Sequence, residues 1–202
     1  HRILKEIDPE IIIVSPASAG GGRHIEYLNR FLAAGGKDCV DVIGHHFYVF
    51  RYSPEAMLPM IRQVKAVMKK HGIGKMPLWN TETGWWIENG DGTPDHPMVA
   101  KGGWKKLSLA PEASDYLLHA LILARAAGVD RFYWYAWDNG SLGMIEATSK
   151  APKPMVDTWR QTVARLQNAS QLQCTQMSQM WSFTFVRQDG QGDQIICPIA
   201  KK

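Results

Sequence analysis

The order of apolar and polar residues along the 202-residue chain predicts strands that alternate with helices. A continuous β-branched run over residues 10–17 is typical of a strand that is buried on both faces. Further apolar stretches of strand length follow at 40–49, 76–83 and 131–139. Apolar residues recur at helical spacing in the segments after each strand, at 25–35, 53–72, 111–128 and 152–166. This alternation predicts βαβ units, and therefore an α/β fold with a parallel sheet.

The C-terminal segment has a different pattern. Residues 179–199 alternate between apolar and polar positions, turn at Asp189-Gly190, and alternate again. Such a pattern predicts a β-hairpin. We therefore expect a domain of four βα units over 1–170 and a β-hairpin appendage over 171–202.

Composition narrows the class of protein. The hydrophobic content of 45% and charged content of 21% are those of an ordinary globular chain. The net charge of +4 is scattered, so no nucleic-acid partner is expected. No apolar run approaches the roughly 20 residues of a membrane span, so no membrane association is expected. The chain begins without Met and reads like the middle of a domain, so we expect a longer gene, and localisation stays open.

The cysteines give little indication of a metal or redox site. The chain has three of them, without CxxC spacing. Neither a zinc site nor a disulfide framework is predicted, although Cys174 and Cys197 could pair. We expect no cofactor and no metal.

Chemistry-bearing residues gather where the predicted strands end. In parallel α/β folds, function is concentrated at the carboxyl ends of the strands. Here that rule selects Ser15, the stretch 45–48, Glu82 and Trp137. All four predicted strands therefore end in polar or aromatic residues, which predicts a single site at this edge of the sheet.

Glu82 is the central candidate. Its strand is apolar before it, and Gly84 and two tryptophans follow it. A carboxylate held in such a rim can act as a nucleophile when Tyr or His donors orient it. The alternative is a salt-bridged acid at the end of a strand, because a lone buried acid is costly.

The adjacent histidines have different expected environments. Neighbouring residues on a strand point to opposite faces, so His45 and His46 cannot both face one substrate. Either of them could be a core histidine. Tyr48 shares the face of His46, so a phenol and an imidazole point to one place. Trp137, near the end of the last predicted strand, is either a platform in a pocket or a core residue.

The stretches "DVIGHHFY", "PLWNTETGWW" and "RFYWYAWDN", followed by "PKP", resemble the second half of the clan-A retaining glycoside hydrolases of the family 39 and family 5 type. The resemblance covers about residues 8–167, and "WNTETGW" is its most specific part. Those enzymes are (β/α)8 TIM barrels, so the resemblance implies half of such a barrel, strands five to eight, plus the hairpin. It implies Glu82 as the catalytic nucleophile and five substrate-binding or supporting residues, which are His46, Tyr48, Asn80, Trp85 and Trp137.

The chain departs from that family in one respect. Retaining enzymes need a second carboxylate as acid/base, about 5–5.5 Å from the nucleophile. The family carries it in an Asn-Glu pair on strand four, and this sequence has no Asn-Glu pair. Glu10 stands at the wrong end of its strand, and Glu88 and Glu146 lie in predicted loops. The resemblance therefore implies a hydrolase of β-linked carbohydrate with weak or no activity alone, or a non-catalytic carbohydrate-binding or self-assembling half-barrel module.

A half-barrel leaves its edges and one apolar face open. We expect this surface to be covered in a homodimer or by the missing N-terminal half.

Overall fold

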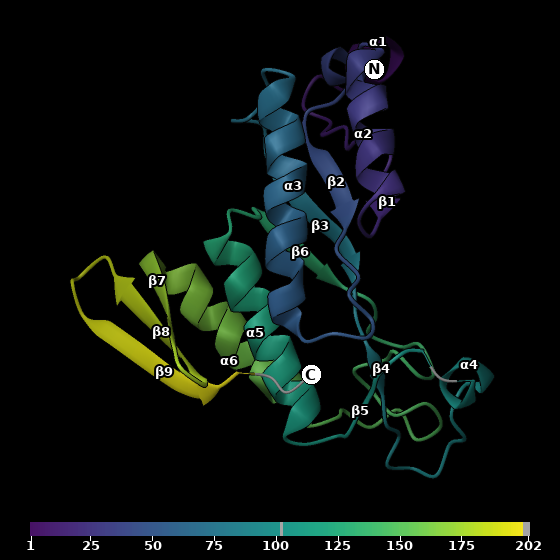
Figure 1. The fold of residues 1–202 in the computed structure, drawn as a ribbon, viewed down its shortest axis with the longest axis vertical. Coiled ribbons are helices and arrows are strands. Elements are labelled where there is room, and N and C mark those ends of the chain that lie inside the picture. The colour runs from purple at the N-terminus through teal and green to yellow at the C-terminus, as the bar shows by residue number, and fades with distance from the viewer. Residues whose placement is uncertain (102, 200–202) are drawn as a thin grey trace. The chain divides into compact units, whose positions relative to one another are not determined.

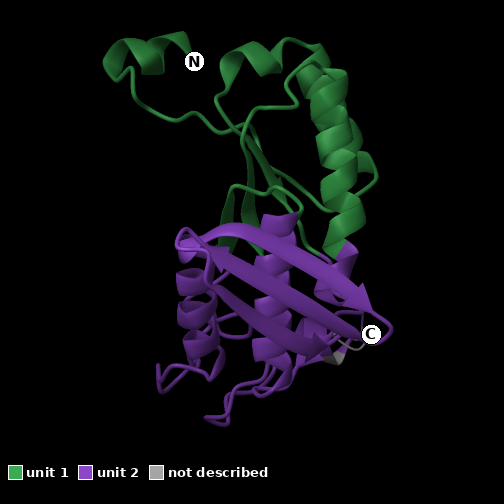
Figure 2. Cartoon of the chain, turned by 90° about the vertical axis from the view of Figure 1, so that its left-hand side faces the viewer, with its two compact units in different colours: residues 1–48, 57–83, 127–134 green, residues 49–56, 84–126, 135–202 purple. Residues whose placement is uncertain are grey.

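The computed structural model describes residues 1–101 and 103–199. The chain forms two compact units, which Figure 2 colours separately. Unit 1 comprises 1–48, 57–83 and 127–134, and unit 2 comprises 49–56, 84–126 and 135–202.

Unit 1 is built on a parallel sheet with the order β1-β2-β3-β6 (Figure 1). Its strands are β1 (Ser18–Ala19), β2 (Ile43–His46), β3 (Leu78–Thr83) and β6 (Arg131–Trp134). The helices of this unit are α1 (Arg2–Ile7), α2 (Arg23–Ala33), the 3-10 helix η1 (Gly36–Cys39) and α3 (Met57–Lys70). A mixed α/β fold with a parallel sheet is therefore confirmed.

The core of unit 1 follows from helical periodicity. Helices α2 and α3 bury apolar residues at spacings of three, four and seven, which are Ile25, Leu28, Leu32, Met57, Ile61, Val64 and Met68. One face of the sheet is also buried, through Ile43 and His45 on β2 and Leu78 and Asn80 on β3. The opposite face of the sheet carries the polar and aromatic residues described below.

The first predicted strand, 10–17, is wrong in its extent and burial. In this segment only an isolated bridge between Val14 and Val42 has strand pairing, and the strand β1 begins after it. Ile12 is 50% exposed, so the run is not buried on both faces. Among the described residues this segment lies at the edge of the sheet, where pairing is possible on one side only, and Pro16 has no N–H to donate.

Unit 2 combines helices with two small sheets. A parallel pair is formed by β4 (Trp86–Ile87) and β5 (Lys106–Leu107). The helices are η2 (Pro54–Ala56), α4 (Pro97–Ala100), α5 (Glu112–Ala126) and α6 (Met155–Asn168). The second sheet is antiparallel, with β7 (Ala169–Met177), β8 (Met180–Arg187) and β9 (Gly192–Pro198) in that order.

The C-terminal sheet has one strand more than the predicted hairpin. Strands β8 and β9 pair around the expected turn, and β7 pairs along the other side of β8. The sequence missed β7 because its strand is rich in Gln and buries no residue fully; only Ala169, Leu172 and Cys174 are half-buried. The domain boundary at residue 170 stays a prediction.

The three cysteines, Cys39, Cys174 and Cys197, are all free thiols, so the suggested Cys174–Cys197 pairing is wrong. Over residues 1–101 and 103–199, no group of three or more His, Cys, Asp and Glu side chains is arranged to hold a metal ion. Over the same residues, no helix has the length and apolar character needed to cross a membrane.

Candidate active site

A β-bulge determines which way Glu82 points. His45 pairs with Asn80, but the next residue of β2, His46, pairs with Glu82, so Thr81 is an extra residue in β3. Strict alternation from the buried Asn80 would direct Glu82 to the buried face of the sheet. The inserted residue restores Glu82 to the opposite face, which it shares with His46.

The Glu82 carboxylate is contacted by both residues that the sequence places on one face. The Tyr48 hydroxyl donates a hydrogen bond to Glu82 Oε1. His46 Nδ1 lies 3.7 Å from Glu82 Oε2. The rings of His46 and Tyr48 meet edge to face, with centroids 6.2 Å apart. The side chains of His46 and Glu82 are 24% and 31% exposed, so this carboxylate is oriented by two partners and open to solvent.

His45 has the opposite environment and is a core histidine. Its ring is fully buried, with Nδ1 3.1 Å from Ser18 Oγ and Nε2 2.8 Å from the Gly20 carbonyl oxygen. Burial lowers the pKa of His45 to about 4. The sequence left open which histidine faces the site, and the contacts assign His46 to it.

Asn80 has both ends of its amide occupied by backbone groups. Its Oδ1 accepts from the Phe47 N–H at 3.3 Å, and its Nδ2 donates to the Tyr133 carbonyl at 3.3 Å. Asn80 is fully buried, and these two hydrogen bonds link β3 to the segment after β2 and to β6. Asn80 therefore holds the backbone of Phe47, the residue that precedes Tyr48.

The sheet face that carries Glu82 also holds a cation–aromatic cluster that sequence reasoning missed. Trp79 pairs with Arg131 across β3 and β6, and the Arg131 guanidinium lies 4.5 Å from the Trp79 ring centroid. The Tyr133 ring is 6.1 Å from Trp79 and Tyr133 is 45% exposed. The signal in the sequence was the alternation of 131–134, which puts Arg131 and Tyr133 on one face.

The two predicted tryptophans lie in unit 2 and differ in exposure. Trp85 is fully buried, donates from Nε1 to the Tyr52 carbonyl at 3.0 Å and meets Tyr116 edge to face. A buried ring cannot stack on a sugar. Of the two roles predicted for Trp85, substrate binding and support, only support is compatible with its burial. Trp137 is 56% exposed, as a stacking platform requires.

The loop acid Glu146 is not available as a catalytic group. It is buried, and its Oε2 accepts from the Gly90 N–H at 2.8 Å. Glu10, the acid before the first predicted strand, is exposed in unit 1.

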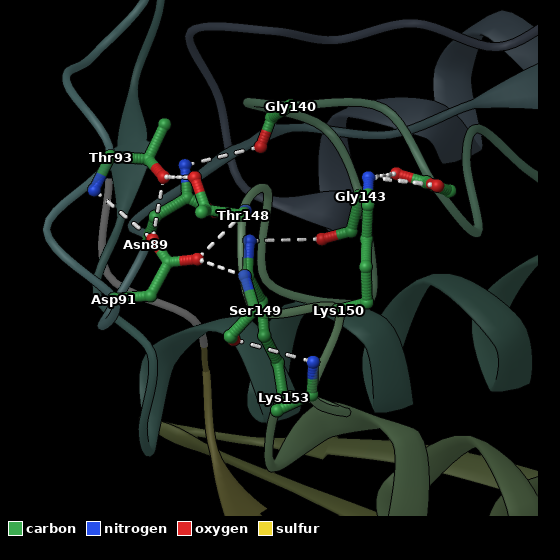
Figure 3. A network of polar contacts seen from close by, with 11 residues as sticks. Asn89, Asp91, Thr93, Gly140, Gly143, Thr148, Ser149, Lys150 and Lys153 are labelled. Atoms are coloured by element: carbon green, nitrogen blue, oxygen red, sulfur yellow. Dashed lines mark hydrogen bonds and ion pairs between the residues drawn. The ribbon is translucent and has the colours of Figure 1, made fainter.

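Loop contacts in unit 2 form the polar network of Figure 3. Asp91 Oδ2 accepts from the N–H groups of Thr148 and Ser149 at 2.8 and 2.9 Å, and Asp91 Oδ1 accepts from Thr93. The Thr93 hydroxyl and these backbone donors hold the pKa of Asp91 well below its usual range. The network therefore ties Asp91 and Thr93 to Thr148 and Ser149.

A Glu-His-Cys arrangement in unit 2 has a structural role. Glu55 Oε1 lies 2.9 Å from His119 Nδ1 and accepts from Trp181 Nε1 at 3.0 Å, while His119 Nε2 lies 3.0 Å from Cys197 Sγ. Burial raises the pKa of Cys197 to about 11, and only the thiolate is a nucleophile. These contacts instead attach β8 and β9 to α5 and η2.

We compared the chain with family models, curated proteins and solved structures. No family model matches the chain, and no curated protein does. Among solved structures, an α-L-arabinofuranosidase from Thermotoga maritima, in complex with arabinose, matches with a TM-score of 0.62 and 15% identity, over 96% of this chain and 40% of that chain. A glucosidase from Croceicoccus marinus matches with a TM-score of 0.60 and 13% identity, over 98% and 47%. A β-glucuronidase 2 from Bacteroides uniformis matches with a TM-score of 0.53 and 13% identity, over 100% and 27%.

The chain thus spans less than half the length of the solved chains that it matches. At these identities the likeness concerns the fold, and it supports a glycoside hydrolase fold.

Proposed function

We propose that the chain is the strand-five-to-eight half of a retaining glycoside hydrolase of the family 39 or family 5 type, with Glu82 as its nucleophile. The observation that carries the proposal is the contact of Tyr48 and His46 with the Glu82 carboxylate at the carboxyl ends of parallel strands. Catalytic groups of (β/α)8 enzymes stand at this end of the barrel. In this proposal His46, Tyr48 and Trp137 bind the sugar, and Asn80 and Trp85 support them.

The chemistry expected of Glu82 is half of the retaining mechanism. A Glu82 oxygen attacks the anomeric carbon, the bond to the leaving oxygen breaks, and a covalent glycosyl-enzyme forms. Tyr48 holds one carboxylate oxygen in place, which leaves the other for attack.

A second carboxylate at this position is missing from unit 1, which is fully described. Asp41 Oδ2 accepts from the Ile13 N–H and Asp130 Oδ2 from the Leu78 N–H, and both acids precede their strands. Without an acid/base, departure of the leaving group goes unassisted. Aryl glycosides with good leaving groups are therefore the expected substrates, and ordinary oligosaccharides are hardly cleaved.

The test is cleavage of 2,4-dinitrophenyl β-D-glucoside and 2,4-dinitrophenyl α-L-arabinofuranoside by wild type and Glu82→Ala. We expect wild type to release dinitrophenolate in a burst and to gain the mass of one glycosyl group on Glu82, because no base activates water for the second step. Azide, which needs no base, should raise the steady rate. Glu10→Ala is the matched carboxylate control and should behave as wild type. Equal release by wild type and Glu82→Ala would remove Glu82 from the mechanism.

A second candidate function is a non-catalytic carbohydrate-binding or self-assembling half-barrel. The open sheet face with Trp79, Arg131 and Tyr133 favours it, because an exposed cluster of this kind is suited to contact with a further chain. The partner would be a second copy or the N-terminal half. Calorimetric sugar binding without any burst would favour this candidate.

Size-exclusion chromatography with light scattering tests whether the partner is a second copy of the chain or the N-terminal half. A well-behaved monomer at low concentration would argue against self-association. Activity gained on adding a separately made strand-one-to-four fragment would support the completed hydrolase.

A further inference from the structure

Unit 2 contains a pocket of about 510 Å³ that involves none of the predicted site residues. One wall is formed by the loop 93–97 and the other by the loop 139–142, with Trp86 and Tyr135 between them. The volume falls within the range of about 300–1,000 Å³ that is usual for small-molecule sites.

Each wall is held by hydrogen bonds that do not depend on a ligand. Asn89 Nδ2 donates to the Gly140 carbonyl at 3.1 Å in the second wall, as Figure 3 shows. The hydroxyl of Thr93, at the start of the first wall, lies 2.9 Å from that of Thr148, and Asp91 accepts from the Thr148 N–H at 2.8 Å. The pocket is therefore lined by loops that are fixed without a ligand.

The aromatic part of the pocket consists of Trp86 and Tyr135. The Trp86 ring stacks on His96, with centroids 4.9 Å apart and an angle of 29° between the planes. Tyr135 is 38% exposed, and its hydroxyl accepts from Asn139 Nδ2 at 3.1 Å. An aromatic wall with polar groups at its edge suits a ligand that has both an apolar face and hydroxyl groups.

The polar part of the pocket carries no unpaired charge. Asp95, the acid of its lining, is paired with Lys106 at 2.8 Å. Such a pair does not favour either an anion or a cation. The ligand that fits is therefore neutral.

We propose that this pocket is an accessory binding site for a neutral sugar ring. The exposed ring of Tyr135 provides the apolar contact, backed by the buried Trp86, and Asn139 and the loop backbone provide the hydrogen bonds. The choice of a sugar as ligand rests on the proposed function, whereas the site itself does not require Glu82 or any turnover.

The experiment is a titration of the ¹⁵N-labelled chain with methyl β-D-glucopyranoside, methyl α-L-arabinofuranoside and sodium D-glucuronate. We expect saturable shifts of the Gly140 and Ser141 amides with the two neutral glycosides, and weaker binding of the charged sugar. Tyr135→Ala should weaken binding at these amides about fivefold, the order of one lost aromatic contact. Tyr52→Ala removes a more exposed tyrosine of unit 2 that does not line the pocket, and should change nothing.

Asn139→Ala is the second variant, for the case in which Tyr135→Ala does not fold. The Asn139 backbone carbonyl, and not its side chain, accepts from Leu142 and Gly143, so the turn is kept. It too should weaken binding.

The proposal is overturned if the Gly140 and Ser141 amides do not move up to the solubility limit of the neutral glycosides. Equal weakening by Tyr135→Ala and Tyr52→Ala would overturn it as well. Repeating the titration with Glu82→Ala separates the two proposals. Intact pocket shifts without any aryl-glycoside burst in wild type contradict the proposed catalysis alone, and a burst without pocket shifts contradicts the accessory site alone.

Discussion

Acidification should destabilise this fold through His45. The ring is fully buried between Ser18 and Gly20, with Nε2 placed to donate to the Gly20 carbonyl and Nδ1 to accept from Ser18. Burial lowers the pKa of His45 from 6.5 to about 4, the Gly20 carbonyl opposes that change, and repulsion from His46 and His24 adds to it. The folded protein therefore keeps this ring neutral at a pH where the unfolded chain protonates it.

The sign of the effect follows from proton binding. Between pH 6.5 and about pH 4 the unfolded state binds more protons at His45 than the folded state does. Stability consequently falls as the pH decreases through this window. At 1.36 kcal/mol for each pH unit, the full loss is about 3 kcal/mol, and about 2 kcal/mol of it is reached at pH 5.

The assay is urea unfolding followed by tryptophan fluorescence at pH 7.5, 6 and 5. His45→Gln keeps a donor and an acceptor at the site but never takes up a proton there. We expect the free energy of unfolding of wild type to fall by about 2 kcal/mol more than that of His45→Gln between pH 7.5 and pH 5. Thr81→Val, which changes no titratable group of the same unit, serves as the control and should retain the wild-type slope. An equal dependence of the free energy of unfolding on pH in wild type and His45→Gln would refute the reasoning.

Three further substitutions have expected effects that follow from the hydrogen bonds and buried groups of the sites that they change. Asn80→Ala removes the acceptor of the buried Phe47 N–H and a donor to the Tyr133 carbonyl, and should lower the free energy of unfolding by about 2–4 kcal/mol in urea titrations; an unchanged midpoint would contradict the link between strands. Thr81→Val, the adjacent control, removes a hydroxyl that is buried without a partner among the described residues, so stability should stay equal or rise by up to about 1 kcal/mol. Asp91→Ala should speed amide hydrogen exchange at Thr148 and Ser149, and unchanged protection there would show that Asp91 does not hold these loops.

The alternation of strands and helices could be predicted because periodicity records burial directly. The stripes of α2 and α3 and the apolar strand residues of β3 were all visible in the sequence. The prediction for 10–17 was wrong because β-branched residues indicate a strand, but they do not indicate whether other strands pair with it along both of its edges. At the edge of the sheet, Ile12 remains exposed although its residue type favours a buried strand.

The candidate site was predictable only in part, because its geometry depends on tertiary structure. His46 and Tyr48 could be assigned to one face from their spacing of two. The same rule, applied from the buried Asn80, sends Glu82 to the wrong face. The extra residue Thr81 corrects this, and a bulge has no signature in the residue types of β3.

The bulge also connects the two candidate functions of the sheet. It places the Glu82 carboxylate on the face that carries Trp79, Arg131 and Tyr133. A partner that covers this face to bury the aromatic cluster would also bound the space in which a sugar reaches Glu82. If such a partner supplies a carboxylate, that group would meet the Arg131 guanidinium and the substrate on one surface. Assembly and catalysis are therefore coupled in this proposal, and the burst assay should be read together with the oligomeric state at the same protein concentration.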